Sequence, residues 1–141
     1  MSDGKQFFDT NILVYTFDLE APEKARRAED LIYRALASGT GMISYQVAQE
    51  FVAVARRRFQ TTLSFEEIER YWERTLRPLL MVHSSPALFG WALNLWRTHQ
   101  LSWYDSLIVA AAMQGGCKIL YSEDLQDGRR FGDLLIENPF L

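Results

Sequence analysis

Hydrophobic and polar positions along this chain follow two different periods, and the way they alternate predicts a parallel α/β sheet. Apolar residues recur at helical spacing in several segments, with short apolar runs between them. The predicted helices span residues 11–17, 22–38, 45–58, 65–77, 86–98 and 103–114. The predicted strands span residues 6–8, 41–44, 79–82 and 117–121, with a last edge strand at 134–136. Helices that alternate with short apolar strands are typical of one parallel sheet covered by helices.

Local signals refine several of these helices. Ser64 and Glu67 form a capping-box pattern that begins the helix at 65–77, which we expect to end before Pro78. The helix at 103–114 is apolar on nearly every side past its first turn, so we expect it to lie buried at the centre of the fold. Aromatic side chains at helical spacing indicate a core or a dimer interface rather than a platform for stacking bases. They are Tyr71, Trp72, Trp91 and Trp96.

The composition is that of a globular protein in a reducing compartment. The chain has 141 residues, 48% hydrophobic and 23% charged, which fits one domain spanning residues 1–141. Its single cysteine, Cys117, cannot form an internal disulfide. No apolar run approaches the roughly 18 residues that a membrane-spanning helix needs, and no hydrophobic signal core opens the chain. We therefore expect a cytoplasmic protein with no membrane partner.

The charge of the chain neither favours nor excludes nucleic acid as a partner. The formal net charge is −3, whereas phosphate contacts normally need a basic surface. Compact basic clusters nevertheless occur, and each could contact a phosphate backbone or simply form a solvated helix face. They are Arg56, Arg57 and Arg58; Lys24, Arg26 and Arg27; and Arg129 with Arg130.

Four acids stand at predicted element ends or at the edge of a buried face, and each also has a structural interpretation. Asp9 follows the first strand, where an aspartate can cap the next helix. Glu50 lies beside apolar residues of its helix, although it could be a solvated acid. Asp105 follows Ser102 at capping-box spacing, and Asp124 follows a strand where turn acids are common. Because strand ends gather at one edge of a parallel sheet, the four acids could share one pocket.

Such a pocket would require a cation. Carboxylates a few ångströms apart raise one another's pKa unless a positive charge neutralises them. All of the candidate ligands are oxygen atoms, and no cysteine or histidine is placed to join them, which indicates Mg²⁺ or Mn²⁺ rather than zinc. Mg²⁺ commonly binds substrates that bring phosphate oxygens, so the pattern favours metal-assisted phosphodiester cleavage.

Four segments, taken in order, carry a resemblance to a known family. They are Phe8–Val14, Ser44–Phe51, Tyr104–Ala112 and Leu120–Leu125. Together they resemble the successive signatures of PIN-domain nucleases, and most closely the VapC-type toxins of bacterial toxin–antitoxin pairs. The likeness runs from Phe7 to about Phe131 and implies an α/β/α sandwich with a central parallel sheet.

The resemblance also implies roles for particular residues and partners. The family's acids that bind one or two Mg²⁺ or Mn²⁺ ions correspond to Asp9, Glu50, Asp105 and Asp124. Thr10, Asn11 and Ser122 would orient ligands or water, and Asp127, which is more typical of a turn, matches the family less securely. The family further implies homodimers, and an antitoxin protein whose tail covers the active site.

The resulting prediction is a Mg²⁺- or Mn²⁺-dependent endoribonuclease that acts as a toxin by blocking translation. RNA is the expected substrate, and Arg56 to Arg58, Arg129 and Arg130 are weaker candidates for RNA contacts. Two alternatives stay open. One is a non-catalytic RNA-binding or scaffold protein of the same fold. The other is a metal-dependent phosphatase, which is less favoured because Asn11 stands where a second aspartate is expected two residues after Asp9.

Overall fold

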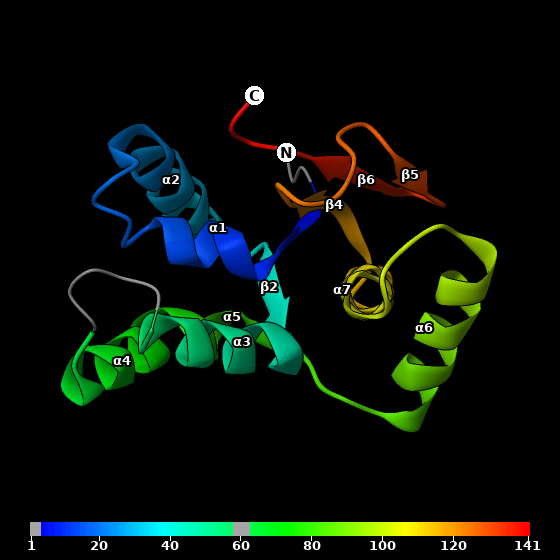
Figure 1. The fold of residues 1–141 in the computed structure, drawn as a ribbon, viewed down its shortest axis with the longest axis horizontal. Coiled ribbons are helices and arrows are strands. Elements are labelled where there is room, and N and C mark those ends of the chain that lie inside the picture. The colour runs from blue at the N-terminus through cyan, green and yellow to red at the C-terminus, as the bar shows by residue number, and fades with distance from the viewer. Residues whose placement is uncertain (1–3, 58–62) are drawn as a thin grey trace.

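The computed structural model describes residues 4–57 and 63–141, and it is built around a mostly parallel sheet (Figure 1). The strands are β1 (Lys5–Phe8), β2 (Gly41–Ser44), β3 (Leu80–Val82), β4 (Cys117–Tyr121), β5 (Arg130–Phe131) and β6 (Leu134–Glu137). Their order in the sheet is β3-β2-β1-β4-β6-β5. Every neighbouring pair runs parallel except β5 and β6, which run antiparallel. The predicted α/β class is confirmed.

Helices cover both faces of this sheet. They are α1 (Thr10–Tyr15), α2 (Pro22–Ser38), α3 (Tyr45–Ala55), α4 (Phe65–Tyr71), α5 (Arg77–Leu79), α6 (Pro86–Thr98) and α7 (Trp103–Gln114), with a π-helical turn, η1 (Trp72–Leu76), between α4 and α5. Figure 1 shows α1 and α2 on one side of the central strands and α6 and α7 on the other. The arrangement is a sandwich of helix, sheet and helix.

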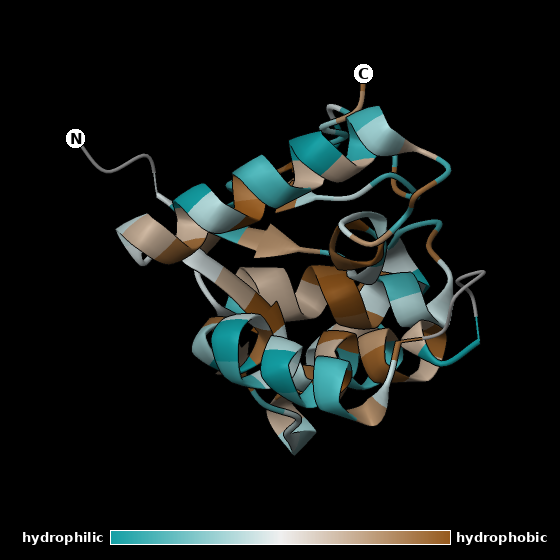
Figure 2. Cartoon of the chain, turned by 90° about the vertical axis from the view of Figure 1, so that its left-hand side faces the viewer, coloured by the Kyte–Doolittle hydropathy of each residue, from teal (hydrophilic) through white to brown (hydrophobic). Residues whose placement is uncertain are grey.

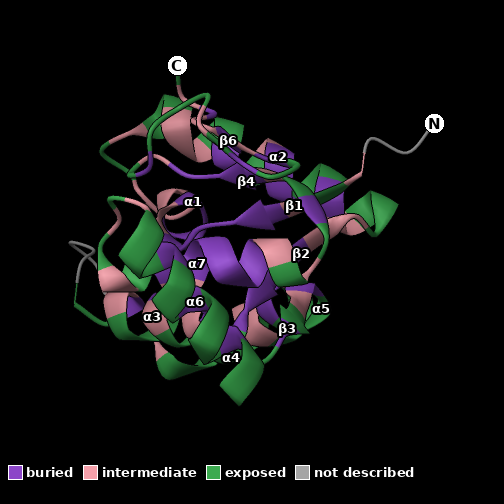
Figure 3. Cartoon of the chain, turned by 90° about the vertical axis from the view of Figure 1, so that its right-hand side faces the viewer, coloured by how far each residue is buried: buried purple, intermediate pink, exposed green. Residues whose placement is uncertain are grey.

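The hydrophobic pattern of each helix accounts for its depth in the sandwich. In α2 one stripe is buried, and Figure 2 shows this long upper helix with its hydrophilic side facing outward. In α7 the run from Ile108 to Ala112 is buried on all sides, as Figure 3 shows beside the more exposed α6. The prediction that α7 lies at the centre of the fold is confirmed. In the part of the chain that the structure describes, no helix is both long and apolar enough to cross a membrane.

The sheet differs from the prediction at its far edge. The strand expected at residues 134–136 is present as β6, but it lies between β4 and β5 and is therefore not the edge strand. The edge is β5, a two-residue strand in a region where the sequence analysis predicts no strand. It pairs with β6 across a turn at Gly132, whose φ of +60° is readily adopted only by glycine. A strand this short has too few residues to show an alternating pattern.

The helical region around Pro78 also differs from the prediction. The chain was expected to leave the helix before Pro78, yet α5 continues to Leu79. The π turn explains this, because the Arg77 amide donates to the carbonyl oxygen of Trp72, five residues earlier. The wider turn offsets the clash that a proline ring otherwise makes with the preceding helical turn. The helix predicted at 45–58 ends at Ala55, and Arg58 lies outside the described residues.

Two of the four aromatic side chains that were predicted to lie in the core or at a dimer interface are not in the core of the chain. Trp91 and Trp96 on α6 are 44% and 50% exposed. Since α6 packs mainly on α7, only a narrow stripe of its residues is buried, namely Leu88, Ala92 and Leu95. Tyr71 and Trp72, by contrast, do pack against the core as predicted.

Candidate active site

Asp9 occupies the point where β1 ends and α1 begins, and it is almost completely buried. Its Oδ1 accepts a hydrogen bond from the Thr10 amide at 2.7 Å, so it is the N-cap of α1 as one interpretation predicted. Its Oδ2 accepts from the Ser122 hydroxyl at 2.8 Å. Burial raises the pKa of Asp9 to about 6, and the nearby charges of Asp124 and Asp105 add to this while the two hydrogen bonds oppose it.

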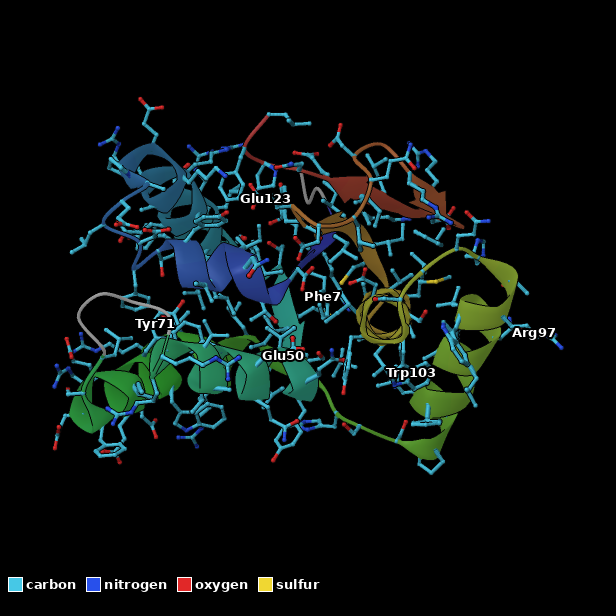
Figure 4. All side chains as sticks on the ribbon, viewed as in Figure 1. Phe7, Glu50, Tyr71, Arg97, Trp103 and Glu123 are labelled. Carbon is cyan, nitrogen blue, oxygen red and sulfur yellow. The ribbon has the colours of Figure 1, made fainter. Side chains whose placement is uncertain are left out.

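Glu50 reaches the same region from α3. This helix begins at Ser44, whose hydroxyl accepts a hydrogen bond from the amide of Val47, and its buried stripe turns Glu50 toward α1. The Thr10 hydroxyl donates to one carboxylate oxygen of Glu50 at 2.6 Å. The Gln46 amide group donates to the other at 3.3 Å. Figure 4 shows Glu50 on the side of α3 that faces α1.

Asp105 and Asp124 come from the other half of the chain. Asp105 lies in the first turn of α7, where its amide donates to the capping hydroxyl of Ser102 at 3.1 Å. Burial raises the pKa of Asp105, and the charges of Asp124 and Glu50 raise it further. Asp124 lies in the loop after β4 and accepts a hydrogen bond from the Asn11 side-chain amide at 2.9 Å.

These four acids line one open pocket of about 280 Å³. The remaining lining residues are Thr10, Asn11, Gln46, Ala53, Val54, Arg57, Tyr104 and Ile108. None of the ion pairs found among residues 4–57 and 63–141 involves one of the four acids. Although Arg57 also lines the pocket, no lysine or arginine in that part of the chain forms an ion pair with the four acids.

The donor atoms fit a hard cation that keeps much of its water. Within the described chain, no three histidine, cysteine, aspartate or glutamate side chains converge closely enough to form a ready-made metal cage. Hydrogen bonds from Thr10, Asn11 and Ser122 hold three of the four carboxylates, those of Asp9, Glu50 and Asp124. Mg²⁺ is commonly bound by one or two carboxylates with several waters and substrate phosphates, whereas zinc is usually bound by cysteine sulfur and histidine nitrogen. An open, all-oxygen pocket suits Mg²⁺ or Mn²⁺.

The PIN domain family matches residues 7–130, which is most of the chain and includes all four pocket acids. The chain belongs to the PIN domain family. The fold of this PIN domain is similar to that of a toxin–antitoxin complex from Klebsiella pneumoniae, with a TM-score of 0.68, 20% identity and coverage of 96% of this chain and 98% of the other. It is also similar to VapC20 of Mycobacterium tuberculosis, a toxin that cleaves the sarcin–ricin loop, with a TM-score of 0.58, 19% identity and coverage of 85% and 90%. No curated protein matches the chain.

The arginines predicted to contact RNA have different positions in this PIN domain. Arg57 lines the acidic pocket. Arg56 instead donates to the carbonyl oxygen of Leu63 at 3.0 Å and lies over the ring of Phe65, 4.4 Å from its centroid. Arg129 lies 4.7 Å from the centroid of the Phe131 ring, and Arg130 is exposed in β5. Of the described arginines on this list, Arg57 alone lines the pocket.

The structure adds two polar pocket residues that the sequence analysis did not single out, Gln46 and Tyr104. Gln46 lies one helical turn before Glu50, so the i, i+4 spacing could have indicated it. Tyr104 directly precedes Asp105, but nothing in its own surroundings marks it as a pocket residue. Asp127, in contrast, is a turn residue, because its Oδ1 accepts a hydrogen bond from the Asn138 amide at 2.7 Å.

Proposed function

We propose that this PIN domain is a divalent-metal-dependent endoribonuclease and the toxin of a toxin–antitoxin pair. One observation carries the proposal. Four acids from distant parts of the chain line a single open pocket, without a pairing lysine or arginine in the described residues. Burying carboxylates beside one another is unfavourable unless a cation from outside neutralises them. A pocket that is open and acidic would attract a cation together with a phosphate-bearing substrate.

Asp9, Glu50, Asp105 and Asp124 would hold the ion in this proposal. A bound Mg²⁺ or Mn²⁺ would supply activation of a water molecule and stabilisation of the negative charge that builds on the phosphate oxygens. The residues of the chain would orient these ligands. Thr10 holds Glu50, Asn11 holds Asp124, and Ser122 holds Asp9, each through one side-chain hydrogen bond. Such supporting bonds typically matter by about 10- to 100-fold in metal affinity or activity.

The proposal also includes an antitoxin partner, an RNA substrate in the cytoplasm and a homodimer. The similar fold of a toxin–antitoxin complex supports an antitoxin protein as a partner. The fold of a toxin described as cleaving the sarcin–ricin loop supports RNA as the substrate, with inhibition of translation in the cytoplasm as the outcome. Exposed apolar side chains on α6, among them Leu93 and Trp96, support a homodimer that buries them.

The test is cleavage of total cellular RNA by the purified protein with Mg²⁺ or Mn²⁺. We expect cleavage that is lost with EDTA and in Asp105→Asn. Asp30→Asn is the matched control, since Asp30 is an exposed acid of α2 that pairs with Arg34 and lies outside the pocket. It should cleave RNA as the wild type does.

Two results would contradict the proposal. Equal cleavage by Asp105→Asn and wild type would indicate a contaminating nuclease or a different site. RNA binding that survives EDTA, with no cleavage of total RNA or of synthetic single-stranded RNA, would favour the non-catalytic RNA-binding protein instead.

A further inference from the structure

A second pocket, of about 250 Å³, adjoins the acidic one. The two pockets share Gln46 and Tyr104 as a common wall. The second pocket is formed where β2 and β3 end and where α3, α6 and α7 begin, which is the same edge of the sheet as the acidic pocket. Ligands of parallel α/β folds gather at this edge, so the second pocket is placed to hold another part of the same substrate.

The chemistry of this second pocket is opposite to that of the first. Among the residues that the structure describes, its lining contains no charged side chain. Three of its walls are exposed aromatic rings, with Tyr45 47%, Phe89 53% and Tyr104 64% exposed. The amide side chains of Gln46 and Gln49 supply both hydrogen-bond donors and acceptors. We refer to it below as the uncharged pocket.

One of the aromatic walls, Phe89, is held in place by the surrounding structure. The ring of Phe89 packs edge-on against Trp103 at a centroid distance of 5.0 Å, and Trp103 packs in turn against Trp96 at 5.7 Å. Figure 4 shows Trp103 between α6 and α7. The α6 helix is capped by Ser85, whose hydroxyl accepts from the Leu88 amide at 3.1 Å. Aromatic rings that are fixed before binding lose little conformational entropy when a flat ligand stacks on them.

We propose that the uncharged pocket binds a nucleobase of single-stranded RNA, next to the phosphate that the acidic pocket receives. This inference rests on the proposed nuclease function and names the part of the substrate that the neighbouring site recognises. A nucleobase is flat and uncharged, with a face that stacks on aromatic rings and an edge that pairs with amide groups. Ribonucleotides alternate such a neutral base with a charged phosphate, and the two adjoining pockets present the same alternation.

Gln46 links the two pockets. Its Nε2 donates to Glu50 at 3.3 Å, so this amide is oriented by an acid of the first pocket while it also lines the second. A base that hydrogen-bonds to Gln46 would therefore be placed at a defined position relative to the acids. The pocket volume is slightly below the range of about 300–1,000 Å³ that is usual for drug-sized ligands, which suits one base rather than a larger group.

The first experiment measures cleavage of a synthetic single-stranded RNA, and of the same RNA with an abasic ribose placed in turn at each position. We expect an abasic ribose beside the cut to lower kcat/KM of the wild type by about tenfold, the size of one base stacked on an aromatic ring. The variants Tyr45→Ala and Phe89→Ala should show a similar loss on intact RNA and little further loss on the abasic RNA. Tyr33→Ala is the matched control, because Tyr33 is 71% exposed on α2 and outside both pockets.

The second experiment does not depend on cleavage. An RNA hexamer carrying 2-aminopurine is titrated into Asp105→Asn protein, and quenching of its fluorescence reports stacking. We expect the Asp105→Asn variant to quench the fluorescence, and so should the double variant that also carries Tyr33→Ala. Quenching should be lost in the double variants that combine Asp105→Asn with Tyr45→Ala or with Phe89→Ala. Thermal melting of each variant shows whether it is folded.

The two experiments separate failure of the inference from failure of the proposed function. Cleavage that is indifferent to abasic positions and to Tyr45→Ala and Phe89→Ala would overturn the base pocket but leave the nuclease intact. Quenching that depends on these residues, without any cleavage by the wild type, would support the base pocket and count against the nuclease. Absence of quenching from folded Asp105→Asn protein would overturn the base pocket and leave it free for a protein partner.

Discussion

Glu123 and Asp124 are adjacent in the loop after β4, yet they have opposite environments. Glu123 accepts hydrogen bonds from the Lys24 ammonium at 2.6 Å and from the Tyr15 hydroxyl at 2.5 Å. The Lys24 ammonium also lies 4.8 Å from the centroid of the Tyr15 ring. Asp124 accepts a hydrogen bond from the neutral amide of Asn11 and faces other acids across the pocket. In Figure 4, Glu123 and Glu50 lie on opposite sides of α1.

The difference separates an acid that stabilises the fold from acids that would bind a ligand in the proposed function. Glu123 receives its positive charge from the same chain, so its environment is complete when the protein folds. The charge of Asp124 raises the pKa of both Asp9 and Asp105, beyond the larger effect of burial, and no arginine or lysine of the described chain forms an ion pair with these acids. Local structures that are unfavourable in isolation commonly occur at functional sites. Substitutions of the two kinds of acid should therefore act on different properties.

The largest expected effect is on activity. Asp124→Asn should lower kcat/KM for RNA cleavage by at least about 100-fold, because a proposed metal ligand matters more than a residue that only supports one. Glu123→Gln, one residue earlier, should lower it by less than about tenfold. Steady-state cleavage of one synthetic RNA by both variants measures the contrast. Similar losses in the two variants would mean that the loop acts as a unit and that the comparison is wrong.

The second prediction concerns stability without metal. Asp9→Asn should be more stable than the wild type at pH 7 in EDTA, because the neutral amide removes the cost of a buried charge. A pKa raised from 3.8 to about 6 corresponds to about 3 kcal/mol, since each unit is worth about 1.4 kcal/mol. The asparagine can keep both existing contacts, by accepting from the Thr10 amide and donating to the Ser122 hydroxyl. Urea unfolding of the two proteins measures the difference.

The stability difference between Asp9→Asn and wild type should depend on pH, whereas a difference caused by packing would not. A carboxyl whose pKa is raised in the folded state favours folding below its unfolded pKa of 3.8 and loses that advantage as the pH rises through about 6. The stability gap between Asp9→Asn and wild type should thus widen from pH 4 to pH 7. A gap that is constant across this range would mean that the Asp9 charge is already compensated in the metal-free protein.

Much of the sheet and of the acid set could be predicted from the sequence, because each rests on a local signal. The α6 and α7 helices and β4 have the predicted bounds, since a proline, a capping serine and a pair of glycines mark their ends. The four acids are recognisable because each stands at an element end or beside an apolar stripe.

Other features depend on packing between distant segments, and these could not be predicted. The exposure of Trp91 follows from where α6 lies, and the same helical stripe would be buried against a sheet. The uncharged pocket joins Tyr45, Phe89 and Tyr104 from three helices, and no spacing along the chain relates them. The pairing of Lys24 with Glu123 spans 99 residues and leaves no local pattern.

The third prediction concerns stabilisation of the fold by a bound divalent cation. Mg²⁺ or Mn²⁺ at about 100 times its dissociation constant should stabilise the wild type by about 2.7 kcal/mol, which raises its Tm by several degrees. The shift should disappear in Asp9→Asn and persist in Asp30→Asn. Calorimetry at constant ionic strength makes the measurement, with K⁺ in place of the divalent ion as the control. A shift of the same size in Asp9→Asn would place the ion elsewhere.

The smallest expected effect is on the stability that the ion pair of Lys24 with Glu123 contributes. Lys24→Met keeps an unbranched side chain but removes the ammonium, which pairs with Glu123 and lies over the rings of Tyr15 and Phe140. We expect a loss of about 1 kcal/mol, because the pair is partly buried and also bonded to Tyr15, whereas exposed pairs contribute less. Arg34→Met is the control, since its pair with Asp30 is exposed, and should cost only a few tenths of a kcal/mol.

The pKa of Lys24 is raised by Glu123, so the loss should be undiminished at pH 7 and should fade only when the lysine deprotonates at high pH. Equal losses in Lys24→Met and Arg34→Met would show that the pair of Lys24 and Glu123 stabilises the fold no more than an ordinary surface ion pair does.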